Sequence, residues 1–210
     1  MKIIDISWPI SQATTGYKDK NIVELAETKN FAKDGARETK LCFSSHTGTH
    51  VDAPSHFLQD GLTIDQIALA RLVGPAKVLD LTTVDNAQIT GDDLAQYASE
   101  IKPGDIILLK TTNSLCSPTD KFNMNFVHLE VSGARYLAKR GVSAVGIDYL
   151  GIERNQPDHS THTTLMHADI LVIEGLRLGH VNPGPYHLTC LPLAIIGVEA
   201  APARAILISE

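Results

Sequence analysis

The sequence has few cysteines, no long apolar run and no excess of basic residues, and each of these absences excludes a class of protein. Its three cysteines, Cys42, Cys116 and Cys190, are far apart and form no CxxC pair, which excludes a disulfide framework and a cysteine-based zinc finger. No stretch approaches the roughly 20 apolar residues that cross a bilayer, so no membrane partner is expected. The 18 basic residues are outnumbered by 24 acidic ones, which disfavours a nucleic-acid partner.

The composition that remains is typical of one soluble globular domain. Hydrophobic residues make up 43% of the chain and charged residues 20%, and no repeat, linker or low-complexity tract divides the 210 residues. We therefore expect a single domain over 1–210. Asp5 lies where a signal peptide would be apolar, and the isolated cysteines suggest reduced thiols, so the sequence predicts a cytoplasmic protein.

Apolar runs with turn signals between them predict a mixed α/β domain. Helices are expected from a capping residue, Thr90, to Ala98 and from Ser132 to Arg140 with Gly141 as the stop, and Thr63 is expected to start a short helix. Residues 11–36 are polar without clear periodicity and give no assignment. The predicted strands are 2–7, 37–46, 76–81, 105–110, 144–148, 170–174, 186–196 and 204–209.

Three of the nine histidines fall within residues 46–56. His46, His50 and Asp52 have the same parity, so an extended chain would point them to one side, with Gly48 leaving an open space between the imidazoles and the carboxylate. Two imidazoles and one carboxylate are a common set for a divalent transition metal with an open coordination position. A lone histidine is more often a surface or core residue, but this clustering, with His56 close by, favours a metal site.

A second candidate pair lies downstream. His162 follows Ser160 and Thr161, which can start a helix, and Glu174 ends the apolar run 170–173 before Gly175. A carboxylate at the end of a buried strand beside glycine is a frequent position for an active-site residue. The alternatives are a strand-end acid that faces water for Glu174 and a capping or surface role for His162.

The segment from His46 to His56 closely resembles the signature HxGTHxDAPxH of the cyclase family of metal-dependent hydrolases, which includes the bacterial kynurenine formamidases, also called arylformamidases. The resemblance continues through most of the chain, in residues 4–7, 141–148, 162–176 and 181–204. It implies the swivelling β/β/α fold of that family and a homo-oligomer, a dimer or tetramer.

Carried over position by position, the resemblance implies a metal held by His46, His50 and Asp52. It also implies that Asp52 bridges to a second metal held by His162 and Glu174. The remaining signature histidine, His56, would be the catalytic acid/base rather than a ligand. Zinc is the first candidate and manganese the second, with one or two ions per chain.

The leading hypothesis is therefore a metal-dependent amidohydrolase that cleaves a small-molecule amide, N-formylkynurenine, to kynurenine and formate. A metal-activated hydroxide would attack the formyl carbon while His56 passes a proton to the leaving aniline nitrogen. One alternative is a relative that opens an isatin-type cyclic amide, and another is a metal-binding protein without turnover. An unligated His56 beside the metal argues against the last alternative.

One departure from the family pattern bears on the substrate. Many relatives carry a Pro-Gly-Asp or Pro-Gly-x-Pro element before the signature, whereas residues 14–20 here contain no proline. Trp8 and Tyr17 are candidates for a pocket that takes an aromatic substrate, and Arg204 is expected to form a structural pair. Five histidines receive no role from the sequence: His128, His159, His167, His180 and His187.

Overall fold

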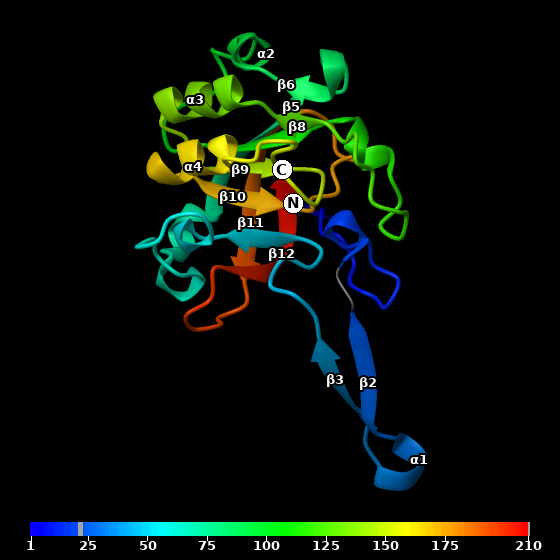
Figure 1. Cartoon of the computed structure of the whole chain (residues 1–210). Coiled ribbons are helices and arrows are strands. Elements are labelled where there is room, and N and C mark those ends of the chain that lie inside the picture. The colour runs from blue at the N-terminus through cyan, green and yellow to red at the C-terminus, as the bar shows by residue number, and fades with distance from the viewer. Residues whose placement is uncertain (21–22, 210) are drawn as a thin grey trace.

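The computed structural model describes residues 1–20 and 23–209, and most of its strands belong to one eight-stranded sheet. In hydrogen-bonding order, the strands are β1 (Lys2–Asp5), β12 (Ala200–Ser209), β11 (Gly184–Pro192), β5 (Val73–Asp80), β7 (Ile106–Lys110), β9 (Ala144–Ile147), β10 (Leu171–Glu174) and β4 (His50–Asp52). Because β4 pairs with β12 as well as with β10, the sheet closes on itself (Figure 1).

The other elements lie outside this sheet. The helices are α1 (Phe31–Asp34), α2 (Gly91–Ala95), α3 (Val131–Arg140) and α4 (Ser160–His167). Two small sheets pair β2 (Glu24–Lys29) with β3 (Glu38–Cys42), and β6 (Gln88–Ile89) with β8 (His128–Leu129). Short 3-10 turns span Tyr17–Asp19, Pro54–His56, Ile64–Gln66, Leu69–Arg71, Asp85–Ala87 and Thr112–Leu115. Among the residues described, no helix combines the length and apolarity needed to cross a membrane.

Both faces of the parallel part of the sheet are buried, which explains its continuous apolar runs. In β7, Ile106 and Leu108 point to a core inside the closed sheet, while Ile107 and Leu109 point to a second core under the helices. The second core takes one leucine from each covering helix: Leu94 of α2, Leu137 of α3 and Leu165 of α4. The predicted strands outside 37–46 are present with shifted ends, and the predicted mixed α/β class is confirmed.

The helix boundaries follow local capping. Thr90 caps α2 in a capping box with Asp93, as its sequence position predicts, but the helix ends at Ala95 instead of Ala98. The prediction that Ser132 caps α3 is wrong. The helix begins at Val131, because the Glu130 side chain caps it by accepting a hydrogen bond from the Ser132 backbone N–H. Gly141 ends α3 in the left-handed conformation, as predicted.

An arm, which we define as residues 24–42, combines the second half of the unassigned segment 11–36 with the start of the predicted strand 37–46. It consists of the antiparallel pair β2 and β3 with α1 at its tip, and it extends away from the closed sheet (Figure 1). Phe31 and Leu41 are 64% and 59% exposed there. The predicted strand 37–46 is therefore correct only for Glu38–Cys42, and the chain from residue 43 onward turns towards the site.

Candidate metal centre

The register between β4 and β10 assembles the centre of the site. Glu174 lies directly opposite His50, and Val172 lies opposite Asp52. Since side chains alternate along a strand, His50, Asp52 and Glu174 all face the same side. The residues between them, such as Val51, pack into the core inside the closed sheet. This pairing places two carboxylates and an imidazole together at buried positions.

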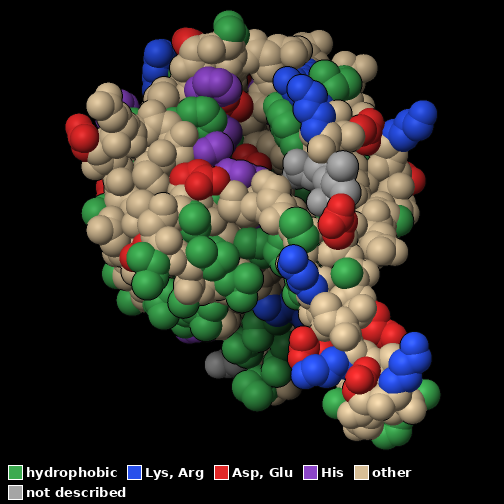
Figure 2. Space-filling view, turned by 60° about the horizontal axis from the view of Figure 1, so that its bottom comes forward, with side chains coloured by type: hydrophobic (Ala, Val, Ile, Leu, Met, Phe, Trp, Pro, Cys, Tyr) green, Lys and Arg blue, Asp and Glu red, His purple; other side chains and the backbone are tan. Residues whose placement is uncertain are grey.

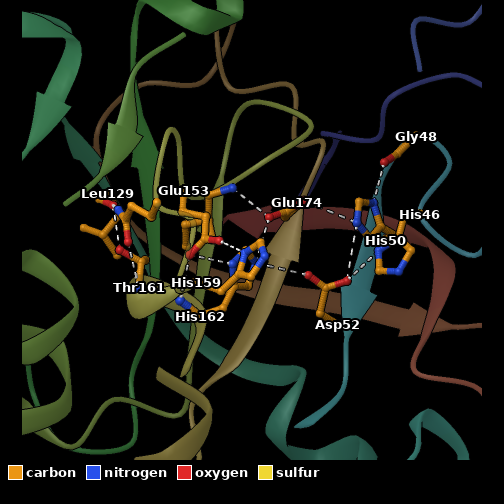
Figure 3. A network of polar contacts seen from close by, with 12 residues as sticks. His46, Gly48, His50, Asp52, Leu129, Glu153, His159, Thr161, His162 and Glu174 are labelled. Carbon is orange, nitrogen blue, oxygen red and sulfur yellow. Dashed lines mark hydrogen bonds and ion pairs between the residues drawn. The ribbon is translucent and has the colours of Figure 1, made fainter. Parts of the chain in front are cut away.

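Two more histidines, His162 and His46, reach this cluster from other elements (Figure 3). His162 projects from α4, and its Nε2 lies 3.8 Å from Asp52 Oδ2 and 3.4 Å from Glu174 Oε1. His46 comes from the turn before β4, and its Nδ1 lies 3.0 Å from Asp52 Oδ1. The two oxygens of Asp52 therefore face different histidines, as a bridging carboxylate would.

His56 lies in the 3-10 turn that follows β4. Its ring centroid is 4.4 Å from that of His46 and 5.9 Å from that of His162. Ligand-type atoms of His46, Asp52 and His56 all lie within 4.8 Å of one another, as do those of His50, Asp52 and Glu174. The structure thus brings together all six residues singled out in the sequence, while the division between ligands and acid/base stays a prediction.

The extended conformation predicted for residues 46–52 is wrong in its first half. Gly48 has φ of +64°, and a Cβ there would lie 3.1 Å from both the Trp8 carbonyl oxygen and Ile10 Cγ1. The glycine is therefore needed for a tight turn against the segment after β1, not for a gap between imidazoles. Its carbonyl lies 2.9 Å from His50 Nδ1 and must accept a hydrogen from it, which leaves His50 Nε2 facing the carboxylates.

A second glycine fixes the other strand of the site. Gly175 follows Glu174 with φ of +69°, and a Cβ there would collide with the Gly48 backbone. The hydroxyl of Thr49 donates to the Gly175 carbonyl at 2.5 Å and accepts from the Trp8 backbone N–H at 2.7 Å. These contacts hold the ends of β4 and β10 together directly behind the site.

The electrostatics of the cluster favour a bound positive charge. Burial and the Asp52 carboxylate would raise the pKa of Glu174, but the nearby imidazole rings of His162 and His50 outweigh these effects and lower that pKa to about 2. Burial likewise opposes charge on His50, yet the carboxylates of Asp52 and Glu174 raise its pKa to about 9. The pKa of Asp52 is held well below its usual range by the same histidines, against its burial.

Several buried polar atoms of the cluster lack a hydrogen-bond partner within the described part of the chain. Those that face one another are Nε2 of His50, both carboxylate oxygens of Asp52, and Nε2 of His162. Buried polar atoms are costly when unpaired, and these atoms converge on one another. A divalent cation coordinated by nitrogen and oxygen fits this donor set, and sets of this kind accept zinc and manganese.

Glu153 is a site residue that the sequence did not reveal. Its Oε2 lies 3.0 Å from His162 Nδ1 and accepts a hydrogen bond from the His162 backbone at 3.2 Å, while its Oε1 contacts His159. His162 and His159 lower the pKa of Glu153 against the effect of burial. Glu153 follows the predicted strand 144–148 in a loop, and no spacing pattern connects it to His162. A carboxylate on the second nitrogen of a ligand histidine orients the ring.

The cluster opens into a cavity of about 310 Å³. His46, His56, His162 and Glu174 line it on the polar side, and its apolar walls are Tyr17, Phe57, Leu150 and Gly151. Figure 2 shows this hollow, with histidines on one wall and acidic side chains at its bottom. Tyr17 therefore lines a cavity, as expected, while the aromatic substrate stays a prediction, and we name this space the catalytic cavity.

Other candidates have structural roles. Trp8 is buried with its ring 6.2 Å from that of Tyr149 and is not among the residues that line the catalytic cavity. Arg204 pairs with Asp5, as predicted. Of the unassigned histidines, His128 bonds the Ala87 carbonyl, His180 lies 3.0 Å from the Asp5 carbonyl, and His159 lines the catalytic cavity.

Comparison with known proteins identifies similar chains. The model of the Cyclase family, described as "Putative cyclase", matches residues 4–154. The chain is 34% identical to kynurenine formamidase from Salinibacter ruber, over 99% of this chain and 97% of the relative. A solved structure of a "predicted metal-dependent hydrolase" from Bacillus stearothermophilus is 41% identical, with a TM-score of 0.87 over 98% of this chain and 97% of that one. Isatin hydrolase A from Labrenzia aggregata, 21% identical with a TM-score of 0.85 over 100% and 94% of the two chains, shares the fold.

Proposed function

Since the chain belongs to the Cyclase family, we propose that it is a metal-dependent arylformamidase that hydrolyses N-formylkynurenine to kynurenine and formate. The observation that carries the proposal is the convergence of unpaired buried nitrogen and oxygen atoms on Asp52, beside a cavity that is lined by His56, His162 and Glu174. The similarity to the kynurenine formamidase of Salinibacter ruber supports this choice of substrate.

In this proposal His46, His50, Asp52, His162 and Glu174 hold the metal. A divalent cation in such a site lowers the pKa of a water ligand towards ~7 and polarises a carbonyl oxygen. Asp52 lies between the two sets of ligand atoms, so it either bridges two ions or serves one ion from both sides. Zinc is our first choice and manganese the second, because both accept histidine and carboxylate ligands.

His56 is proposed to move the proton. Burial lowers its pKa, and this effect outweighs the attraction of Asp52, so the ring is neutral near pH 7 and free to accept a proton. The C–N bond of the formamide breaks as the water oxygen bonds to the formyl carbon, and His56 passes the water proton to the aniline nitrogen. Phe57 contacts the His56 and His162 rings and, with Tyr17, gives the aromatic part of the substrate an apolar wall.

The test is an assay of formate release on protein whose metal content is known. We expect formate and kynurenine from N-formylkynurenine, with activity lost on chelation and restored by the metal that elemental analysis finds. Protein that opens isatin but leaves N-formylkynurenine intact would replace the substrate by a cyclic amide. Protein that holds metal and releases no product from either compound would favour a metal-binding role without turnover.

We also propose that the chain forms a homo-oligomer through its arm. A two-stranded hairpin is marginally stable alone in water, and the arm exposes Phe31 and Leu41. A second copy that covers these side chains would stabilise it. Light scattering should find a dimer or tetramer, and the double variant Phe31→Ser with Leu41→Ser should dissociate it; a monomeric wild type would contradict the proposal. The cytoplasmic location is likewise proposed, with support from three free thiols.

A further inference from the structure

A second cavity lies beside the catalytic cavity and carries no role in the chemistry described above. It has a volume of about 270 Å³ and shares three lining residues with the catalytic cavity: Tyr17, Glu153 and His159. Its distinguishing residues are two cations, Lys18 and Arg154. Figure 2 shows basic side chains across the opening from the histidines. A molecule whose reacting group lies against His56 can therefore extend into this second cavity.

Arg154 differs from the other partly buried arginines because no described group pairs with its guanidinium or accepts a hydrogen bond from it, whereas Arg140 and Arg177 donate to backbone carbonyls. No carboxylate of the described residues lies within 4.0 Å of its guanidinium, whereas Arg71 and Arg204 each pair with an aspartate. Its Nε is buried and has no hydrogen-bond partner among the described groups. The guanidinium carbon lies 5.9 Å from the centroid of the Phe126 ring, so an aromatic face supports it. A buried N–H without a partner is costly, which indicates a missing acceptor.

The neighbouring carboxylate does not supply this acceptor. Glu153 precedes Arg154 in the chain, but its two oxygens contact His159 and His162. The Lys18 ammonium lies 5.2 Å from the centroid of the Tyr17 ring and forms no ion pair within the described residues. Two cations thus line the same small cavity without a bound counter-charge from the protein.

The wall that carries Lys18 is a fixed part of the structure. Lys18 and Asp19 have φ of 53° and 55°, a left-handed conformation that non-glycine residues adopt uncommonly. Each such residue costs of order 1–3 kcal/mol unless its surroundings hold it. Here Asp19 Oδ1 accepts a hydrogen bond at 2.9 Å from the backbone N–H of Phe122, another residue that lines the cavity. The turn is therefore tied to another segment that lines the same cavity.

We propose that the second cavity is an anion subsite, and that Arg154 is a specificity residue that binds a carboxylate at the far end of the amide substrate. The planar guanidinium matches a carboxylate in a bidentate geometry, and Lys18 adds a point charge. This inference rests on the proposed function and defines its substrate class: an arylformamide with an acidic side arm. N-formylkynurenine has this form, with the formamide at His56 and the amino-acid carboxylate at Arg154, whereas formanilide has no carboxylate to place there.

The test compares two ligands that differ only in charge. Calorimetry measures the binding of 4-oxo-4-phenylbutanoate and of its carboxamide to the protein as purified. The wild type should bind the acid more tightly, because a hydrogen bond to a charged group is worth about 10- to 100-fold in affinity. Arg154→Met should abolish this preference and Arg154→Lys should retain part of it, while Lys18→Met should reduce it. The matched control is Arg135→Met, which removes an exposed arginine of α3 and should keep the wild-type preference.

The result that overturns the inference is a wild type that binds the two ligands equally or binds neither, or an Arg154→Met variant that keeps the preference. Because binding is measured without turnover, failure of the proposed function has a different signature. In that case the acid is preferred and Arg154→Met removes the preference, but no formate is released from N-formylkynurenine or formanilide. If the chain is an arylformamidase, the ratio of kcat/KM for N-formylkynurenine to that for its carboxamide should also fall about 10- to 100-fold in Arg154→Met.

Discussion

Asp148 lies directly after β9, at the start of the loop that carries Glu153 to the site, and it is completely buried. Its carboxylate accepts hydrogen bonds from the Thr111 backbone at 2.8 Å, the Thr111 hydroxyl at 2.7 Å and the Ser114 hydroxyl at 2.6 Å. Burial disfavours the charged form more strongly than these three bonds favour it, and it raises the pKa of Asp148 to about 6. This group should therefore make the stability of the protein depend on pH.

The native protein holds the Asp148 proton over a pH range in which the unfolded chain, with an ordinary pKa of 3.8, has released it. The native state then binds more protons than the unfolded state, so the free energy of unfolding falls as pH rises. The stabilisation is fully present below about pH 4 and is lost by the time the pH passes about 6. The difference between the two pKa values corresponds to a change of about 3 kcal/mol in the free energy of unfolding.

Asp148→Asn removes this titration and isolates its effect. We expect the free energy of unfolding of the variant, minus that of the wild type, to increase by about 3 kcal/mol between pH 4 and pH 7. Urea unfolding of both proteins in chelator measures this slope without a contribution from bound metal. Asparagine offers a poorer acceptor to Thr111 and Ser114, which adds an offset that does not depend on pH. A difference that stays constant or decreases with pH would refute the reasoning, because the hydrogen bonds would then outweigh burial.

The other predictions concern the metal centre. Asp52→Ala should lose its metal and its activity, and its melting temperature should fall as well. His56→Ala should keep its metal, and its turnover should fall about 10²–10⁴-fold. If elemental analysis finds that both variants lose metal equally, His56 is a ligand. Glu174→Gln should lower bound metal from about two ions per chain towards one, and a wild type that saturates at one ion would remove the bridge through Asp52. Glu153→Ala should weaken metal affinity about 10- to 100-fold in competition with a chelator; an unchanged affinity would show that Glu153 does not position its histidine.

The part of the site that lies on strands was accessible from sequence. His50 and Asp52 share a face because they are two residues apart in β4, and Glu174 ends an apolar run that is buried on both faces. These are local sequence patterns, and they do not depend on how the rest of the chain folds. The pairing of β4 with β10 is different, because no local pattern specifies which strand becomes the neighbour. The family resemblance, rather than periodicity, connected Glu174 to the histidine cluster.

The features of the fold and the site that the sequence did not predict depend on contacts between distant segments, or on the absence of such contacts. Glu153 reaches His162 from an irregular loop, and a loop has no regular alternation of side chains from which the position of Glu153 could be predicted. In the arm, β3 lies within the predicted strand 37–46, but β2 was missed because it exposes most of both faces and its sequence lacks the apolar alternation that marks a half-buried strand. Gly48 was assigned to an extended chain because parity alone cannot distinguish a strand from a turn, and the close approach of Trp8 and Ile10 decides in favour of the turn.

Closure of the sheet and assembly of the site depend on the same short strand. β4 has three residues, and it must pair with β10 on one side and β12 on the other for the sheet to close. Its one apolar side chain, Val51, anchors it in the inner core, while His50 and Asp52 face the site. Without a cation, this strand carries a buried carboxylate beside that of Glu174, and their mutual repulsion opposes the pairing. In the proposed metal site, an ion held by β4, β10 and α4 would remove that repulsion and link the three elements, so the ion proposed for the chemistry would also stabilise the closed sheet.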